Sequence, residues 1–132
     1  MSGLIISLNI MYGLLAHFIG DYLFQNDFIA NQKTKKTWPA VVHVLLYSIP
    51  FYFILGFSYA LLFVIVTHFF IDRYRLAVYW IRLINWNWDK DIDNFGYKDD
   101  KPKWMSFWLM VIYDNIFHII FNSIAIAYHF YL

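Results

Sequence analysis

Cysteine is absent from this chain of 132 residues. Disulfide bridges, thiolate metal ligands and lipid anchors on cysteine are therefore all excluded. Any metal site in this protein must be built from imidazole and carboxylate groups.

Charged residues are scarce as well. They make up 14% of the chain, whereas hydrophobic residues make up 61%, and ordinary soluble domains have about 25% charged residues. A soluble domain of this size could not bury so much apolar surface. The net charge of +1 creates no overall field that would attract nucleic acid. The composition predicts a single membrane domain over residues 1–132. Its expected partner is membrane lipid, and no nucleic-acid partner is expected.

Four apolar segments alternate with polar stretches. About twenty helical residues cross a hydrocarbon core of about 30 Å. We therefore predict an all-α integral membrane bundle of four transmembrane helices, with spans at about 4–30, 39–55, 57–84 and 104–131. The third segment ends with arginines interspersed among apolar and aromatic residues, which predicts an amphipathic extension lying in the membrane interface.

The basic residues predict the orientation. All ten Lys and Arg residues lie between positions 33 and 103, in the first loop, the end of the third segment or the loop after it. With four spans these regions share one side of the membrane, which the positive-inside rule makes cytoplasmic. We expect both termini to lie outside. Lys33, Lys35 and Lys36 are interpreted as determinants of this topology with some affinity for anionic lipid.

Three of the apolar segments carry a histidine and an aspartate four residues apart. The pairs are His17 and Asp21, His68 and Asp72, and, in reverse order, Asp114 and His118. Four residues apart on a helix means one above the other on the same face. Gln25 and Asn122 extend two of these rows by four further residues, and the second segment contributes His43.

Polar groups at these positions are costly in a membrane. An aspartate at mid-helix costs roughly 2.5–3.5 kcal/mol on insertion scales, so three cost on the order of 8–10 kcal/mol if left alone. Contact between groups on different helices is the most direct compensation. The sequence therefore predicts that seven residues converge on one polar centre: His17, Asp21, His43, His68, Asp72, Asp114 and His118.

Four motifs follow one another along the chain: His17-x3-Asp21-x3-Gln25, then His43, then Thr67-His68-x2-Ile71-Asp72-Arg73, then Asp114-x3-His118. In this order they resemble a group of small polytopic bacterial and phage membrane proteins known only as a domain of unknown function. The likeness covers nearly the whole chain, although that group usually has Asp-Gln where this chain has Asp114-Asn115. The resemblance implies a place in the bacterial inner membrane and brings no activity. A looser similarity, in the Thr-His…Asp style of motif, is to membrane proteins described as metal-dependent hydrolases.

One hypothesis is a metal-dependent hydrolase that acts on a membrane-associated ester or phosphoester. Imidazoles and carboxylates suit zinc, manganese or iron, and a bound ion would make a nucleophile of its water. The metal ligands would be His17, Asp21, His68, Asp72 and His118. Asp114 or His43 would act as general base or orient the ligands, and Gln25 or Asn122 would position the substrate.

Two other hypotheses remain open. Intramembrane chains of aspartate and histidine are typical of proton and ion pathways, and a homo-oligomer could supply a pathway that four short helices lack. The polar groups could also serve only as a scaffold that joins the helices, at about 0.6 kcal/mol per contact. The three pairs together with His43 favour a functional centre, because the free energy gained from such contacts is small compared with the free energy of inserting the polar groups.

The long hydrophilic loop carries a calcium-like pattern. Asp89, Asp91, Asp93 and Asp100 fall on positions 1, 3, 5 and 12 of a calcium-binding loop. Asn94 replaces the glycine that such loops need at their turn, so we interpret this segment as a solvated loop.

Overall fold

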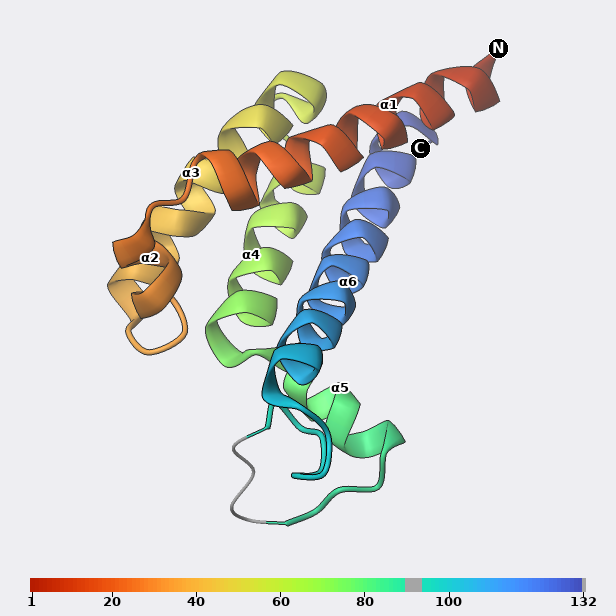
Figure 1. Ribbon diagram of the computed structural model, residues 1–132. Helices are drawn as coiled ribbons and strands as arrows, with labels where there is room; N and C mark the ends of the chain where they lie inside the picture. The colour runs from red at the N-terminus through yellow and green to blue at the C-terminus, as the bar shows by residue number, and fades with distance from the viewer. Residues whose placement is uncertain (90–93, 132) are drawn as a thin grey trace.

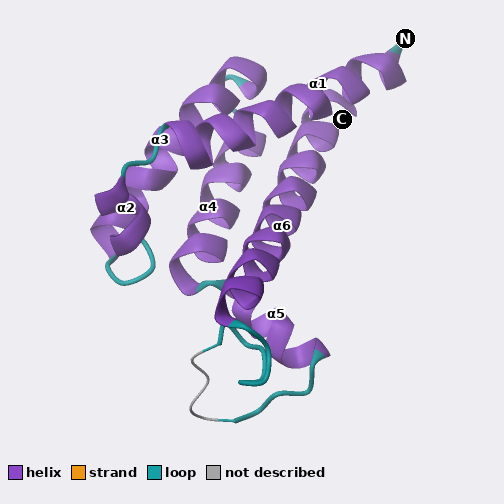
Figure 2. Ribbon diagram, viewed as in Figure 1, coloured by secondary structure: helices purple, strands orange, loops and turns teal. Residues whose placement is uncertain are grey.

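The computed structural model describes residues 1–89 and 94–131, and the regular elements of these residues are all helical (Figure 2). No strand occurs in this described part, which confirms the all-α prediction. Three helical stretches are long and apolar enough to cross a membrane: Ser2–Leu23, Thr37–Leu55 and Lys103–Tyr131. They point to a membrane protein.

The first apolar segment is divided into three pieces. Helix α1 covers Ser2–Phe18, the π-helical turn η1 covers Ile19–Leu23, and the short helix α2 covers Asp27–Gln32. The predicted segment 4–30 is thus interrupted after η1. The interruption has a local cause, because the extended Asn26 accepts a hydrogen bond from the backbone N–H of Ile29 at 2.9 Å and so caps a new helix.

Helices α3 and α4 follow as an antiparallel pair that covers Thr37–Leu55 and Tyr59–Tyr74 (Figure 1). Gly56 turns the chain between them with a φ of 57°, which a residue without Cβ adopts at little cost. Helix α3 agrees with the predicted segment 39–55 and continues through Pro50. Helix α4, with 16 residues, is shorter than the about 20 residues that a perpendicular span requires.

The predicted third segment, 57–84, is two helices. Helix α4 ends at Tyr74, and the left-handed φ of 49° at the next residue, Arg75, redirects the chain into helix α5, Leu76–Ile84. Helix α5 buries Ala77 and Ile81 in a small cluster with residues of the last helix α6, Lys103–Tyr131. The amphipathic extension is therefore a separate helix that lies beneath the bundle.

The four long helices pack around one interior. Helix α6 contacts α1 and α4, and α3 contacts the same two helices. Apolar side chains fill the half of the bundle nearer the two termini, which lie at the same end (Figure 1). We call this cluster the apolar core; its buried members are Ala16, Tyr47, Phe51, Leu55, Ala60, Leu61, Val64, Ala125 and Ile126. Large apolar side chains such as Leu15, Leu45 and Ile124 stay exposed on the outer faces, as expected of helices that meet lipid.

Candidate functional site

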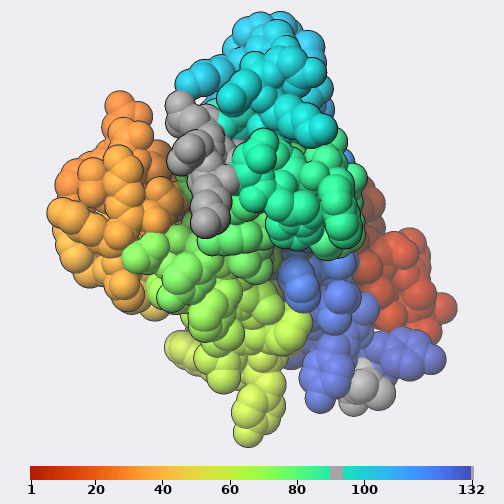
Figure 3. Space-filling view, turned by 90° about the horizontal axis from the view of Figure 1, so that it is seen from below, coloured from red at the N-terminus to blue at the C-terminus, as the bar shows by residue number. Residues whose placement is uncertain are grey.

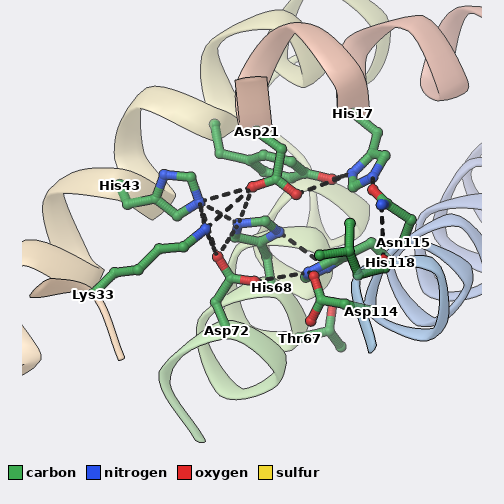
Figure 4. Close-up of polar contacts among 12 residues, drawn as sticks. His17, Asp21, Lys33, His43, Thr67, His68, Asp72, Asp114, Asn115 and His118 are labelled. Carbon is green, nitrogen blue, oxygen red and sulfur yellow. Dashed lines mark hydrogen bonds and ion pairs between the residues drawn. The ribbon is translucent and has the colours of Figure 1, made fainter. Parts of the chain in front are cut away.

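The other half of the bundle interior is polar. Each long helix and the π-helical turn contribute ionisable side chains that point toward one another (Figure 4). All seven residues that were predicted to converge are brought together, and one lysine joins them. We call this set the polar centre: His17, Asp21, Lys33, His43, His68, Asp72, Asp114 and His118.

Asp72 lies at the middle of the polar centre, and each of its oxygens faces different partners. Asp72 Oδ1 lies 2.9 Å from His118 Nε2 on α6. Asp72 Oδ2 lies 3.0 Å from His43 Nε2 on α3 and 3.3 Å from His68 Nε2 one turn away on α4. The carboxylate is 4% exposed, and it therefore depends on these partners instead of water.

Three imidazoles form a continuous row across the interior. His43 Nε2 lies 2.9 Å from His68 Nε2, and His68 Nδ1 lies 3.1 Å from His118 Nδ1. The phenol ring of Tyr47 stacks on His68 with ring centroids 3.5 Å apart, which holds the central imidazole in place. All three histidines are buried. The row can relay protons, or it can present lone pairs to a cation.

Asp21 reaches the polar centre from the π-helical turn η1. Its Oδ1 atom lies 3.0 Å from His43 Nε2 and 3.7 Å from His68 Nε2. The preceding Gly20 packs directly on Tyr47, and a Cβ at that position would lie 2.6 Å from Tyr47 Cδ2. The absence of a side chain thus lets the π-helical turn approach α3 closely enough for Asp21 to reach the centre. Such turns are frequent at functional sites.

Lys33 is the member that sequence reasoning missed. Its ammonium group contacts Asp72 Oδ2 and lies 3.5 Å from Asp21 Oδ1 and 3.2 Å from His43 Nε2. Burial by itself lowers the pKa of Lys33, but the carboxylates of Asp72 and Asp21 outweigh burial and hold this pKa above its ordinary value. The lysine was interpreted as a loop residue facing lipid headgroups. The capping residue Asn26 was the available signal, because a new helix there turns the following loop back over the bundle.

His17 lies at the upper edge of the polar centre. Its Nδ1 atom lies 2.9 Å from the Tyr47 hydroxyl and its Nε2 atom lies 2.7 Å from Asn115 Oδ1. Since the amide of Asn122 donates to the Tyr47 hydroxyl at 2.7 Å, that hydroxyl can donate to His17. Both ring nitrogens of His17 therefore have neutral hydrogen-bond partners, and Asp21 Oδ2 lies 3.7 Å from Nδ1. Asn122, predicted to position a substrate, is buried behind Tyr47.

Asp114 and Gln25 lie where the polar centre opens to the surface. Asp114 Oδ2 is 3.4 Å from His118 Nε2, and the Asp114 side chain is 25% exposed. Both residues line a cavity of about 220 Å³ that Asp21, Lys33 and Asp72 also reach. Gln25 Oε1 is buried without a hydrogen-bond partner. We infer that this cavity is the entrance to the polar centre and that Asp114 and Gln25 stand at its rim.

Four of the carboxylates and imidazoles have the spacing of a metal-ligand group. Asp21, His68, Asp72 and His118 each offer one atom, and within the described residues these four atoms all lie within 4.8 Å of one another. All four side chains are buried. The calcium-like pattern of the hydrophilic loop is a different case, because Asp91 and Asp93 lie outside the described residues.

Comparison with known proteins gives one match. A family model described as a protein of unknown function, DUF3307, matches residues 10–132. The comparisons with curated proteins and with solved structures found no match.

Proposed function

We infer the function of this chain, which belongs to the DUF3307 family of proteins of unknown function, from its own side chains. We propose that the protein is a membrane-embedded, metal-dependent hydrolase that acts on a membrane-associated ester or phosphoester. The polar centre would hold a divalent ion, zinc, manganese or iron, and the cavity beside it would admit the substrate.

The observation that carries this proposal is the environment of Asp72 Oδ2. Two imidazole nitrogens lie 3.0 and 3.3 Å from it, yet this buried oxygen accepts no hydrogen bond from either of them, and its charge is balanced by the Lys33 ammonium. Atoms that bind one ion at about 2.0–2.2 Å lie about 3–3.6 Å apart and point at the ion instead of at one another. A buried carboxylate oxygen that already attracts a cation and faces several imidazole nitrogens has the surroundings that a metal site requires.

Lys33 supports the same interpretation. Its ammonium group lies among Asp21, Asp72 and His43, where the two carboxylates attract a positive charge. A divalent ion would compete with this ammonium for the same oxygens. We propose that Lys33 is the cation of the centre when metal is absent and moves aside when metal binds.

The proposed ligands are Asp21, His68, Asp72 and His118, whose ligand atoms all lie within 4.8 Å of one another. His43 faces both carboxylates at 3.0 Å and would complete the set. His17 was also predicted as a ligand; with both nitrogens engaged by Tyr47 and Asn115, we assign it the positioning of Asp21, four residues away.

A bound ion would lower the pKa of a coordinated water and supply the nucleophile. Asp114 is the best candidate for the general base, because it contacts His118 and is open to the entrance cavity. Gln25 would donate to or accept from the substrate at the cavity rim, since its oxygen has no partner in the protein. Asn122, behind Tyr47, would act on the substrate only through the Tyr47 and His17 network.

For the membrane arrangement we propose four crossings: the three long apolar stretches and, between the second and third of them, the shorter helix α4. Two observations support an even number: both termini lie at one end of the bundle (Figure 1), and α4 packs antiparallel between α3 and α6. The lysines and arginines gather at the other end, which we assign to the cytoplasmic face of a bacterial inner membrane.

Proton or ion translocation is the second candidate. The row of His43, His68 and His118, with contacts of 2.9 and 3.1 Å, favours it specifically, because adjacent imidazoles can pass a proton along. A homo-oligomer could extend this row into a complete pathway. A polar centre that only joins the helices is the third reading.

Metal analysis of the full chain, purified in detergent without chelator, tests the proposal. We expect about one divalent ion per chain, loss of that ion in Asp72→Asn, and retention in Asp27→Asn, which removes an exposed carboxylate at the start of α2. The metal-loaded protein should hydrolyse a chromogenic ester or phosphoester in mixed micelles, and Asp114→Asn should slow hydrolysis by about 100-fold or more without removing the ion.

Protein that stays free of metal after incubation with zinc, manganese and iron(II) would reject the hydrolase. Proton flux in liposomes that depends on His68 would then support translocation. If the protein binds no metal and shows no proton flux, and Asp72→Asn changes only its thermal stability, the polar centre would be a scaffold that joins the helices.

A further inference from the structure

A second cavity opens on the same end of the molecule, beneath the junction of α4 and α5. It has a volume of about 540 Å³ and is lined by three arginines, Arg73, Arg75 and Arg82, together with the aromatic side chains of Tyr79 and Phe95. Viewed from this end, the segment around α5 (green) lies near the middle of the surface and the segment around α2 (orange) lies at its left edge (Figure 3). A cavity of this size can hold a small ligand or a lipid headgroup.

The three guanidinium groups are held in place by neutral partners. Arg73 donates to the backbone carbonyl of Thr34 at 2.8 Å, and Arg82 donates to the carbonyl of Asn87 at 3.3 Å. Arg75 lies over the ring of Phe95 at 6.0 Å. None of these arginines pairs with a carboxylate in residues 1–89 and 94–131. The cavity is therefore rich in fixed positive charge that no described side chain neutralises.

This cavity adjoins the entrance to the polar centre. Thr34 and Arg75 line both cavities. Arg75 therefore lies at the boundary between the arginine cavity and the entrance cavity, which Asp114 also lines. An anion bound by Arg75 would lie next to the entrance of the polar centre.

The surroundings indicate where the anion comes from. Helix α5 exposes Tyr79, Trp80 and Leu83 beside the arginines, an arrangement typical of a helix at the level of lipid headgroups. Arginine forks match the geometry of phosphate oxygens, and aromatic rings beside them suit the first carbons of an acyl chain.

We propose that the arginine cavity binds the phosphate headgroup of an anionic membrane lipid and presents that lipid to the polar centre. As a statement about the substrate class this rests on the proposed hydrolase. As a lipid-binding site it stands without the metal.

Native mass spectrometry of the full chain in detergent tests the site. Three probes are titrated separately: dihexanoyl phosphatidic acid, dihexanoyl phosphatidylcholine and inorganic phosphate. We expect one phosphatidic acid per chain, bound at least about tenfold more tightly than either of the other probes. Arg75→Gln should weaken this binding by about tenfold or more, the usual effect of losing a charged hydrogen bond. Arg75→Lys, which keeps the charge and loses the fork, should fall between.

Lys98→Gln is the matched control, because it removes one exposed positive charge outside the cavity and should leave binding unchanged. Equal losses in Arg75→Gln and Lys98→Gln would overturn the site, and so would the absence of phosphatidic acid binding. Inorganic phosphate binding as tightly as the lipid would overturn the membrane source, and equal binding of phosphatidylcholine would overturn headgroup recognition.

Metal content measured on the same samples separates this site from the proposed hydrolase. Phosphatidic acid binding without metal would leave the lipid site standing and reject the hydrolase. If the protein binds metal but no phosphatidic acid, the lipid-binding proposal is rejected and the proposed hydrolase is not.

Discussion

The apolar core and the polar centre occupy two halves of one bundle interior and differ in what holds them together. In the apolar core, Phe51, Val64 and Ile126 are stabilised by leaving water or lipid-like surroundings for close packing, which has no preferred direction. In the polar centre, a buried carboxylate such as that of Asp72 is tolerated only because imidazole nitrogens of His43 and His118 face it. Tyr47 belongs to both halves, since its ring stacks on His68 and packs on Phe51.

The difference teaches where function can reside. The apolar core could be rebuilt from other side chains of similar volume, whereas the polar centre keeps groups that are costly in a membrane, four of which could hold a metal ion. Exchanging properties between the two halves is therefore the most direct test of the comparison.

A carboxylate placed in the apolar core should have the largest effect. Val64→Asp puts a charge where Val64 is fully buried among the side chains of the apolar core. We expect destabilisation of at least about 3–5 kcal/mol, the cost of an uncompensated buried charge. Thermal unfolding in detergent and the yield of monodisperse protein measure it. Val64→Ala serves as the control for lost packing, and a stable Val64→Asp protein would mean that pairing is not what makes Asp72 tolerable.

Removing the hydroxyl that joins the two halves should have a smaller effect. Tyr47→Phe keeps the ring stack and leaves Asn122 and His17 without their shared partner. The expected loss is about 1–3 kcal/mol of unfolding free energy, measured by the same thermal unfolding. Tyr52→Phe, on the exposed face of α3, should change nothing; equal effects in the two variants would show that the network contributes no stability.

Neutralising Lys33 should sharpen the distinction between a cation site and a scaffold. In Lys33→Met the competing ammonium is gone, so a divalent ion meets two carboxylates that have lost their lysine partner, and we expect metal affinity to rise by about tenfold, or about 1.4 kcal/mol. Competition titration with a chelator of known affinity measures this, with Lys36→Met at an exposed position as the control. An unchanged or weakened affinity in Lys33→Met would contradict the assignment of Lys33 as the resident cation.

A conservative change in the apolar core should have the smallest effect. Ile126→Val removes one methylene from a fully buried side chain that packs near Gly13, which costs about 0.5–1.5 kcal/mol. Metal content should stay the same, and the exposed Ile120→Val should be neutral in both measurements. Loss of metal in Ile126→Val would show that the two halves are coupled.

Much of the site could be read from spacing along the chain. The four-residue interval placed His68 and Asp72 on one face of α4, and the cost of burying an unpaired aspartate argued that the rows from different segments meet. Lys33 escaped this reasoning, because its approach to Asp72 depends on the break after η1 and the helix that Asn26 starts. The left-handed Arg75 that separates α4 from α5 escaped as well, since an arginine there gives no turn signal.

The sequence by itself determined that the protein is helical and apolar and that its histidines and aspartates share helix faces, because those properties follow from local spacing and from composition. Only the tertiary structure decided which atoms meet: that Asp72 stands between three imidazoles, that His17 turns to Tyr47 and Asn115, and that Lys33 enters from a loop. Contacts between side chains far apart in the sequence depend on helix rotation, close approach at Gly20 and the path of the loops, which no local pattern encodes.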